Sequence, residues 1–73
     1  MAISVADIID YKEFKIVPIQ IGDGYIARIR RADGRHFVVE RAISDYYDTM
    51  QFADRETAVN NAKLIADSAT LQR

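Results

Sequence analysis

Apolar and polar residues alternate along most of the segment from residue 14 to residue 43. Two turn sequences interrupt this alternation, Gly-Asp-Gly at 22–24 and Ala-Asp-Gly at 32–34. Each contains an Asp-Gly step between stretches rich in Ile, Val, Tyr and Phe, which is typical of β-hairpins. The pattern therefore predicts three consecutive antiparallel strands, a β-meander, over 14–43.

The two turns also predict the register. A three-residue loop with a left-handed glycine at its third position suits both of them. This register places Ile19 opposite Ala27, and Ile29 opposite Phe37. The predicted inner face is Val17, Ile19, Ile21, Tyr25, Ala27, Ile29, Phe37, Val39 and Ile43. The predicted outer face is Ile16, Pro18, Gln20, Ile26, Arg28, Arg30, His36, Val38, Glu40 and Ala42.

Helical spacing of small apolar residues predicts one C-terminal helix over 54–71, with Asp54 as its N-cap. Its predicted buried face consists of Ala58, Val59, Ala62, Ile65, Ala66 and Ala69. Alanines on the helix complement bulky residues on the sheet. A second, shorter helix is predicted over 1–11, with Ser4 as N-cap. Polar residues and aromatics alternate in 44–51, which is predicted to be a structured loop.

The chain has 73 residues, which predicts a single domain. The sequence contains no cysteine, so disulfides and thiol chemistry are excluded. No apolar run is long enough to span a membrane, and the N-terminal segment lacks the features of a signal peptide. A cytoplasmic location is the resulting expectation. The predicted fold class is α+β: a short N-terminal helix, a three-stranded antiparallel meander, and one C-terminal helix on its inner face.

The candidate chemistry is sparse, and we expect neither an enzyme nor a cofactor or metal site. His36 is the single histidine, and no nucleophile lies near it in the sequence. The glycines at 22–24 lie between two strands, whereas a phosphate-binding loop opens a helix. Asp45 and Asp48 lack the spacing of a calcium loop.

Charge is uneven, because residues 28–41 carry five arginines although the whole chain has a net charge of −1. Arg28, Arg30 and His36 are predicted on the outer face, and Arg31 and Arg35 at the second turn. Arginines on a sheet can read bases in the major groove. Nucleic-acid modules are usually strongly basic, however, and this chain is not. The alternatives are a solvated face or a face that contacts protein.

The predicted outer face also carries apolar residues, which is typical of an interface. Leu64 and Leu71 form a second stripe on the C-terminal helix, seven residues apart. We therefore expect a protein-interaction module, with self-association as one form and nucleic-acid binding as the alternative. The candidate surface is Ile16, Ile26, Arg28, Arg30, Arg31, Arg35, His36, Val38, Leu64 and Leu71.

The order of a three-strand meander, an aromatic residue, an N-cap and an Ala-x-x-x-Ala helix resembles several small bacterial domains of unknown function. Residues 52–58 and then Ala62 carry this resemblance. It implies that the helix covers one face of the sheet, and it implies no activity or functional residue.

Overall fold

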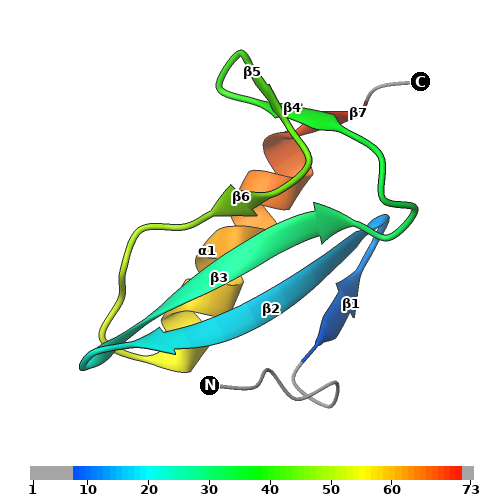
Figure 1. The fold of residues 1–73 in the computed structure, drawn as a ribbon. Coiled ribbons are helices and arrows are strands. Elements are labelled where there is room, and N and C mark those ends of the chain that lie inside the picture. Colours follow the sequence, from blue (N-terminus) through cyan, green and yellow to red (C-terminus); the bar gives the residue numbers. More distant parts are fainter. Residues whose placement is uncertain (1–7, 72–73) are drawn as a thin grey trace.

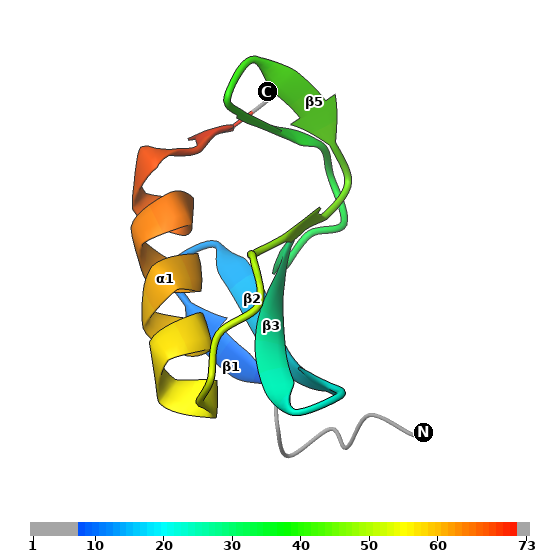
Figure 2. The same cartoon turned by 90° about the vertical axis from the view of Figure 1, so that its left-hand side faces the viewer.

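In the computed structural model, which describes residues 8–71, one helix covers one face of an antiparallel sheet (Figure 1). The main sheet has the order β1-β2-β3-β6, with β1 Ile9–Tyr11, β2 Phe14–Ile21, β3 Gly24–Arg31 and β6 Tyr47–Asp48. A second sheet has the order β5-β4-β7, with β4 Phe37–Val39, β5 Ala42–Ser44 and β7 Thr70–Leu71. The helix α1 is Arg55–Ser68. Figure 2 shows α1 on one side of the main sheet and the second sheet beyond one end of both.

The α+β class, the antiparallel sheet and the C-terminal helix are confirmed, whereas the count of three strands is wrong. The predicted helix over 1–11 is also wrong where the structure describes it, because Ile9–Tyr11 form β1 and pair with Phe14–Ile16. Residues 1–7 lie outside the described part. Ile9 and Tyr11 both pack against the core, and a strand allows this because alternate residues share a face.

The first hairpin has a two-residue loop, Gly22-Asp23, and Ile21 pairs with Gly24. Gly22 has a φ of 57°, which suits the first position of a tight hairpin turn. The predicted three-residue loop is therefore wrong, and β2 presents the opposite face. Ile16 pairs with Ile29, and both side chains are fully buried.

The sequence misled here because β2 is apolar on both faces. Phe14 and Ile16 could fill a core as well as Val17 and Ile19 could, so alternation does not choose between them. The choice depends on the turn, where a glycine stands at each end. Gly24 is required for a different reason, since a Cβ there would lie 2.7 Å from the Phe52 carbonyl oxygen.

The second turn forms, and Gly34 has the expected positive φ of 77°. The Gly34 N–H donates to the Arg31 carbonyl at 3.1 Å. The chain does not return beside β3, however, so the predicted second hairpin is wrong. Phe37 instead enters the second sheet, where it pairs with Ser44 and Leu71.

The place beside β3 is taken by the segment predicted as a loop. Tyr47 pairs with Ile29 in β6, and the Thr49 N–H donates to the Ala27 carbonyl at 3.0 Å. Tyr25 and Phe52 then exchange two backbone hydrogen bonds of 2.7 and 2.8 Å. Residues 47–52 therefore satisfy backbone groups along most of the second edge of β3.

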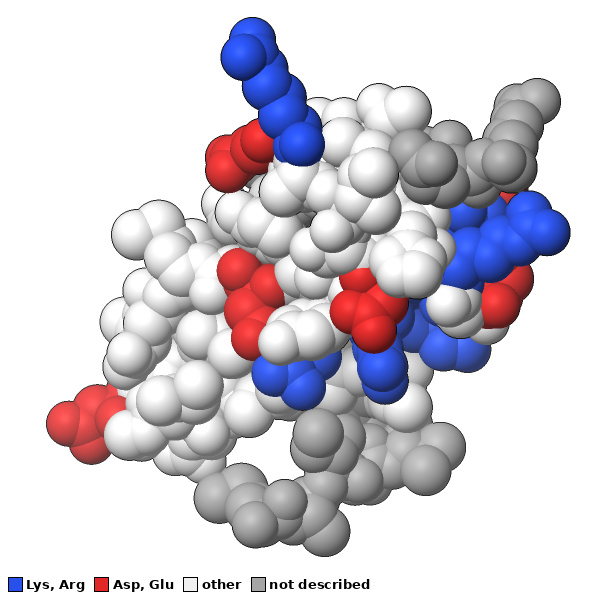
Figure 3. Space-filling view, turned by 45° about the horizontal axis from the view of Figure 1, so that its top comes forward, with Lys and Arg blue, Asp and Glu red and all other residues white. Residues whose placement is uncertain are grey.

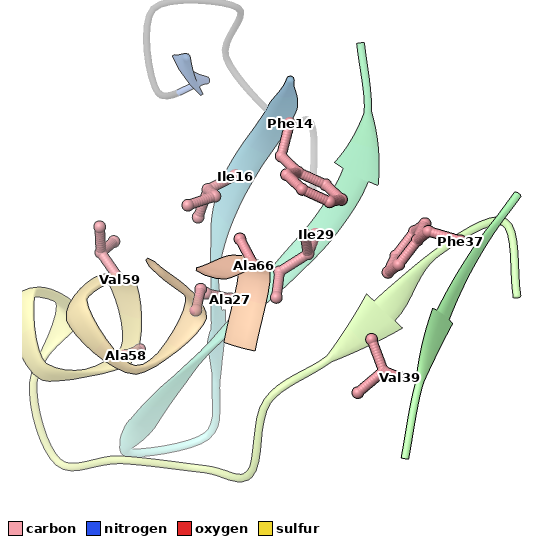
Figure 4. Packing of buried hydrophobic residues seen from close by; sticks show 10 residues of the cluster. Phe14, Ile16, Ala27, Ile29, Phe37, Val39, Ala58, Val59 and Ala66 are labelled. Atoms are coloured by element: carbon pink, nitrogen blue, oxygen red, sulfur yellow. The ribbon is translucent and has the colours of Figure 1, made fainter. Parts of the chain in front are cut away.

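The core lies between α1 and the inner face of the main sheet, and it reaches the second sheet through Phe37 and Val39 (Figure 4). The rings of Phe14 and Phe37 meet edge to face, with centroids 5.3 Å apart. The helix contributes small residues, as predicted. The buried hydrophobic residues are Phe14, Ile16, Ala27, Ile29, Phe37, Val39, Ala58, Val59, Ala62 and Ala66.

Both ends of α1 are fixed by side chains. Asp54 is the N-cap, as predicted, and its carboxylate accepts from the Thr57 N–H at 2.9 Å, which lowers the pKa of Asp54. Asp67 lies in the last turn, where a negative charge opposes the helix dipole. Lys12 and Tyr11 offset this effect by donating hydrogen bonds to the Asp67 carboxylate, and they lower its pKa.

The β4–β5 turn contains two strained residues. Val39 pairs with Ala42, and the two loop residues between them, Glu40 and Arg41, have φ values of 53° and 71°. Tight turns of this kind favour asparagine and glycine because a Cβ is unfavourable at positive φ. The absence of these residues explains why the sequence did not indicate this turn.

Gly24→Ala should lower the free energy of unfolding by about 1 to 3 kcal/mol, because the new methyl group would overlap the Phe52 carbonyl and the Gln51 side chain. Gly22→Ala should also be destabilising, but only through its positive φ, because its Cβ would meet no atom within 4 Å. Urea unfolding measures the loss for Gly24→Ala. A free energy of unfolding unchanged by Gly24→Ala would contradict the close approach of residues 51–52 to β3.

Arg41→Gly should raise the free energy of unfolding by about 1 kcal/mol, because glycine adopts the φ of 71° without strain. Ala42→Gly is the control. Ala42 lies in β5, where glycine should be destabilising by roughly 0.5–1 kcal/mol. Thermal or urea unfolding measures both, and a destabilised Arg41→Gly variant would rule out this turn conformation.

Candidate functional site

The face of the main sheet opposite α1 carries no other described element, and we call it the outer face. From the middle of the sheet to the β2–β3 turn, this face holds four branched aliphatic side chains, which we call the aliphatic patch. They are Val17, Ile19, Ile21 and Ile26. Ile21 is 45% exposed, and the other three are partly buried by their neighbours. In a strand with one solvated face, apolar residues usually alternate with polar ones, and the polar residues occupy the solvated face. Four aliphatic residues together on such a face therefore indicate a contact surface.

The other half of the outer face is charged, and most of its charges are paired. Arg28 forms a two-point salt bridge with Asp48, through Nε at 2.8 Å and Nη2 at 3.1 Å. The Arg28 guanidinium also lies 4.6 Å from the centre of the Tyr46 ring. The hydrogen bonds that Arg28 donates to Asp48 raise the pKa of Arg28 above its ordinary value. Arg28 is therefore held against Asp48 and Tyr46 on the outer face, with its charge offset.

Lys15 and Arg30 lie opposite each other at the end of this charged half. Lys15 donates to Asp10 at 2.7 Å, whereas Arg30 is exposed. Figure 3 shows the same arrangement more broadly, since acidic and basic side chains lie beside one another on the face in view. This mixture of signs is unlike the continuous positive surface that contacts phosphates.

A shallow hollow of about 380 Å³ opens at the charged end of the outer face. It is lined by Ile8, Lys15, Val17, Arg30, Arg31, Ala32, Gly34 and Asp45. Lys15 and Arg31 bond to Asp10 and Asp33, and Asp45 adds a negative charge to the wall. The hollow is therefore nearly balanced in charge, and it extends the outer face rather than forming an anion site of its own.

Two predicted interface residues lie in the interior instead. Ile16 is fully buried against the helix side of the sheet, because β2 has the opposite register from the one predicted. Arg31 is on the same inner face and is only 9% exposed. Its guanidinium donates to Asp33 at 2.8 Å and to the His36 carbonyl at 3.1 Å. Arg31 therefore anchors the second turn and does not face a partner.

His36 and Val38 were predicted on the outer face, and they lie away from it because the second hairpin does not form. Arg35 was predicted at the second turn and follows Gly34 there. Arg35 and His36 are exposed in the connection between β3 and β4. The predicted position of His36 on the outer face is therefore wrong. Val38 lies in the second sheet opposite Ile43, which was predicted to be buried and is 63% exposed.

Ile26, Arg28 and Arg30 occupy the outer face as predicted. Leu64 is 67% exposed on α1, away from the buried alanines. Leu71 belongs to β7 instead of the helix, and its side chain lies outside the described part of the structure. The predicted Leu64/Leu71 stripe is therefore wrong as a helix face, because α1 ends at Ser68.

Among residues 8–71, β1 pairs with β2 as far as Ile16, and no strand pairs with that edge beyond it. We call this stretch, which contains Pro18, the free edge. Ala27, opposite Pro18, directs its N–H and carbonyl toward Thr49, so Pro18 directs its own backbone toward the free edge. Because proline has no N–H to donate, this edge is poorly suited to pairing with another strand.

The residues that sequence reasoning missed are Val17, Ile19 and Ile21, which it placed in the core. A signal for them existed, since β2 is apolar on both faces and one helix can cover only one. Asp48 and Tyr46 were also missed as partners of Arg28. They could not be found from the sequence, because the pairing of β6 with β3 joins residues twenty positions apart.

Within residues 8–71 no group of three or more His, Cys, Asp or Glu side chains could hold a metal ion. No described helix has the length and apolar character needed to cross a membrane. No protein-family model, curated protein or solved structure shows significant similarity to this chain. The resemblance to small bacterial domains stays a prediction.

Proposed function

We propose that this chain is a non-enzymatic protein-interaction module that binds through the outer face of its main sheet. The observation that carries the proposal is the aliphatic patch of β2 and β3. It lies on a face that no described element covers, and paired charges border it on the side away from the β2–β3 turn. Burial of these four side chains by a partner contributes to the free energy of binding, by about 25 cal/mol for each Å² of apolar surface removed from water.

The surroundings of the patch favour a protein partner. Interfaces combine an apolar centre with a polar rim, and the charged half of the outer face supplies such a rim. The Arg28 side chain is already oriented by Asp48 and Tyr46, so little conformational entropy is lost when a partner packs over it.

Nucleic-acid binding is the competing hypothesis, and the geometry favours it less. Arg31 is buried, and the charge of Arg28 is offset by Asp48. Of the four predicted arginines, Arg30 and Arg35 are the two that stay exposed. Two separate cations contribute little to phosphate binding, which depends on the number of contacts.

A photo-reactive residue in place of Ile26 should cross-link to protein when cells that produce the chain are irradiated. The same residue in place of Glu56, which is exposed on α1, is the matched control. We expect protein adducts, identified by mass spectrometry, several times more often at position 26 than at position 56. Equal yields at the two positions would contradict the proposal, provided that both variants unfold at the wild-type temperature.

Arg30→Ala/Arg35→Ala tests the competing hypothesis. If the outer face does not bind nucleic acid, the wild type should bind DNA and RNA only weakly and no more tightly than this variant. Fluorescence anisotropy at low salt measures both affinities, since counterion release is strongest there. Tight, salt-dependent binding that the double substitution removes would establish the nucleic-acid hypothesis instead.

A further inference from the structure

We infer that the outer face binds a second copy of this chain, with the two sheets packed face to face and their β2 strands antiparallel. The two-fold axis runs across the strands at the level of the Ile19–Ile26 pair. This inference rests on the proposed function and specifies its partner. It is derived from the order of side chains along the β2–β3 hairpin.

The aliphatic patch is centred on that level. Ile19 and Ile26 pair with each other, and Ile21 and Val17 lie two residues to either side of Ile19. A two-fold axis through this level places Ile21 of one copy over Val17 of the other. Ile19 and Ile26 then each meet their own equivalent, so the patch covers itself.

The charges at the two ends of the hairpin are complementary in the same arrangement. Asp23 is exposed in the turn, three residues along the chain from Ile26 and four from Ile19, which both lie at the axis. Arg30 is exposed four residues beyond the axis in the opposite direction. The axis therefore brings Asp23 of each copy over Arg30 of the other, which forms two opposite-charge contacts per dimer.

The other face-to-face arrangement is unfavourable. An axis along the strands, between β2 and β3, would place Lys15 of one copy over Arg30 of the other, since these residues share a level in the sheet. Like charges opposed at an interface oppose binding. Pro18 disfavours assembly through the free edge of β2, so the face is the better surface.

The size of the outer face indicates the expected affinity of the dimer. Each strand of the hairpin has eight residues, so the face is about 27 Å long and, with its flanking strands, roughly 15 Å wide. Two such faces bury about 800 Å² in total, which is below the roughly 1,200 Å² of stable specific interfaces and in the range of weak, transient ones. The dimer should therefore form at micromolar to millimolar protein concentrations.

Charge reversal tests the arrangement by analytical ultracentrifugation of the purified chain, at up to about 1 mM because the interface is small. Asp23→Arg alone and Arg30→Asp alone should each weaken dimerisation roughly tenfold, since both contacts become repulsive. The double variant, and an equimolar mixture of the two single variants, should dimerise as the wild type does. Glu56→Arg, on α1, is the control and should change nothing.

The outcomes separate this inference from the proposed function. If the wild type is monomeric at the highest concentration, the inference that a second copy is the partner is overturned. The cross-linking at position 26 then still decides the proposed function. A dimer that Ile26→Glu abolishes, but whose charge variants show no rescue, keeps the face as a contact and overturns this two-fold arrangement. A dimer that Ile26→Glu leaves unchanged uses another surface and overturns this inference, and the cross-linking at position 26 again decides the proposed function. Rescue in the mixture supports the arrangement, because a change in folding cannot produce it.

Discussion

The register between β2 and β3 is the constraint on which the rest of the structure depends. A two-residue turn at Gly22-Asp23 fixes it, and a shift of one residue would exchange the faces of the whole strand. In the observed register, Phe14 and Ile16 enter the core. Val17, Ile19 and Ile21 are left on the outer face. The same constraint therefore determines both the core and the candidate interface.

The helix completes the core because the side chains on its buried face are small. Ala58, Ala62 and Ala66 let the helix axis lie close to a sheet that supplies Ile16, Ile29 and Phe37. Its ends are tied by Asp54 at the start, and by Lys12 and Tyr11 at Asp67. One helix of 14 residues covers one side of the main sheet, and no other described element covers the opposite side.

Several local signals in the sequence were reliable, whereas the loop length at 22–24, the helix predicted over 1–11 and the long-range pairing were not. The N-cap at Asp54, the buried alanines and the left-handed Gly34 all follow from nearby residues. The faces of β2 did not, because the strand is apolar on both sides. The partner of β3 also could not be predicted, since a strong turn at 32–34 suggested β4 while β6 occupies that edge.

The candidate site shows the same division. Ile26, Arg28 and Arg30 were placed correctly because their strand follows a clear alternation. The predicted exposure of Ile16 was wrong because the predicted register of β2 was wrong. The predicted exposure of Arg31 was wrong because it lies on the inner face of β3 with its side chain buried. The partners of Arg28 depend on the fold of the whole chain, and a structure was needed to identify them.

Amide chemical shifts measured by NMR across a dilution series test the central claim most directly, namely that the outer face is the contact surface. The account predicts that shifts between micromolar and millimolar concentrations change for β2, β3 and the 22–23 turn, while those of α1 stay constant. Changes centred on α1 around Leu64, or on the β4–β5 hairpin, would contradict it.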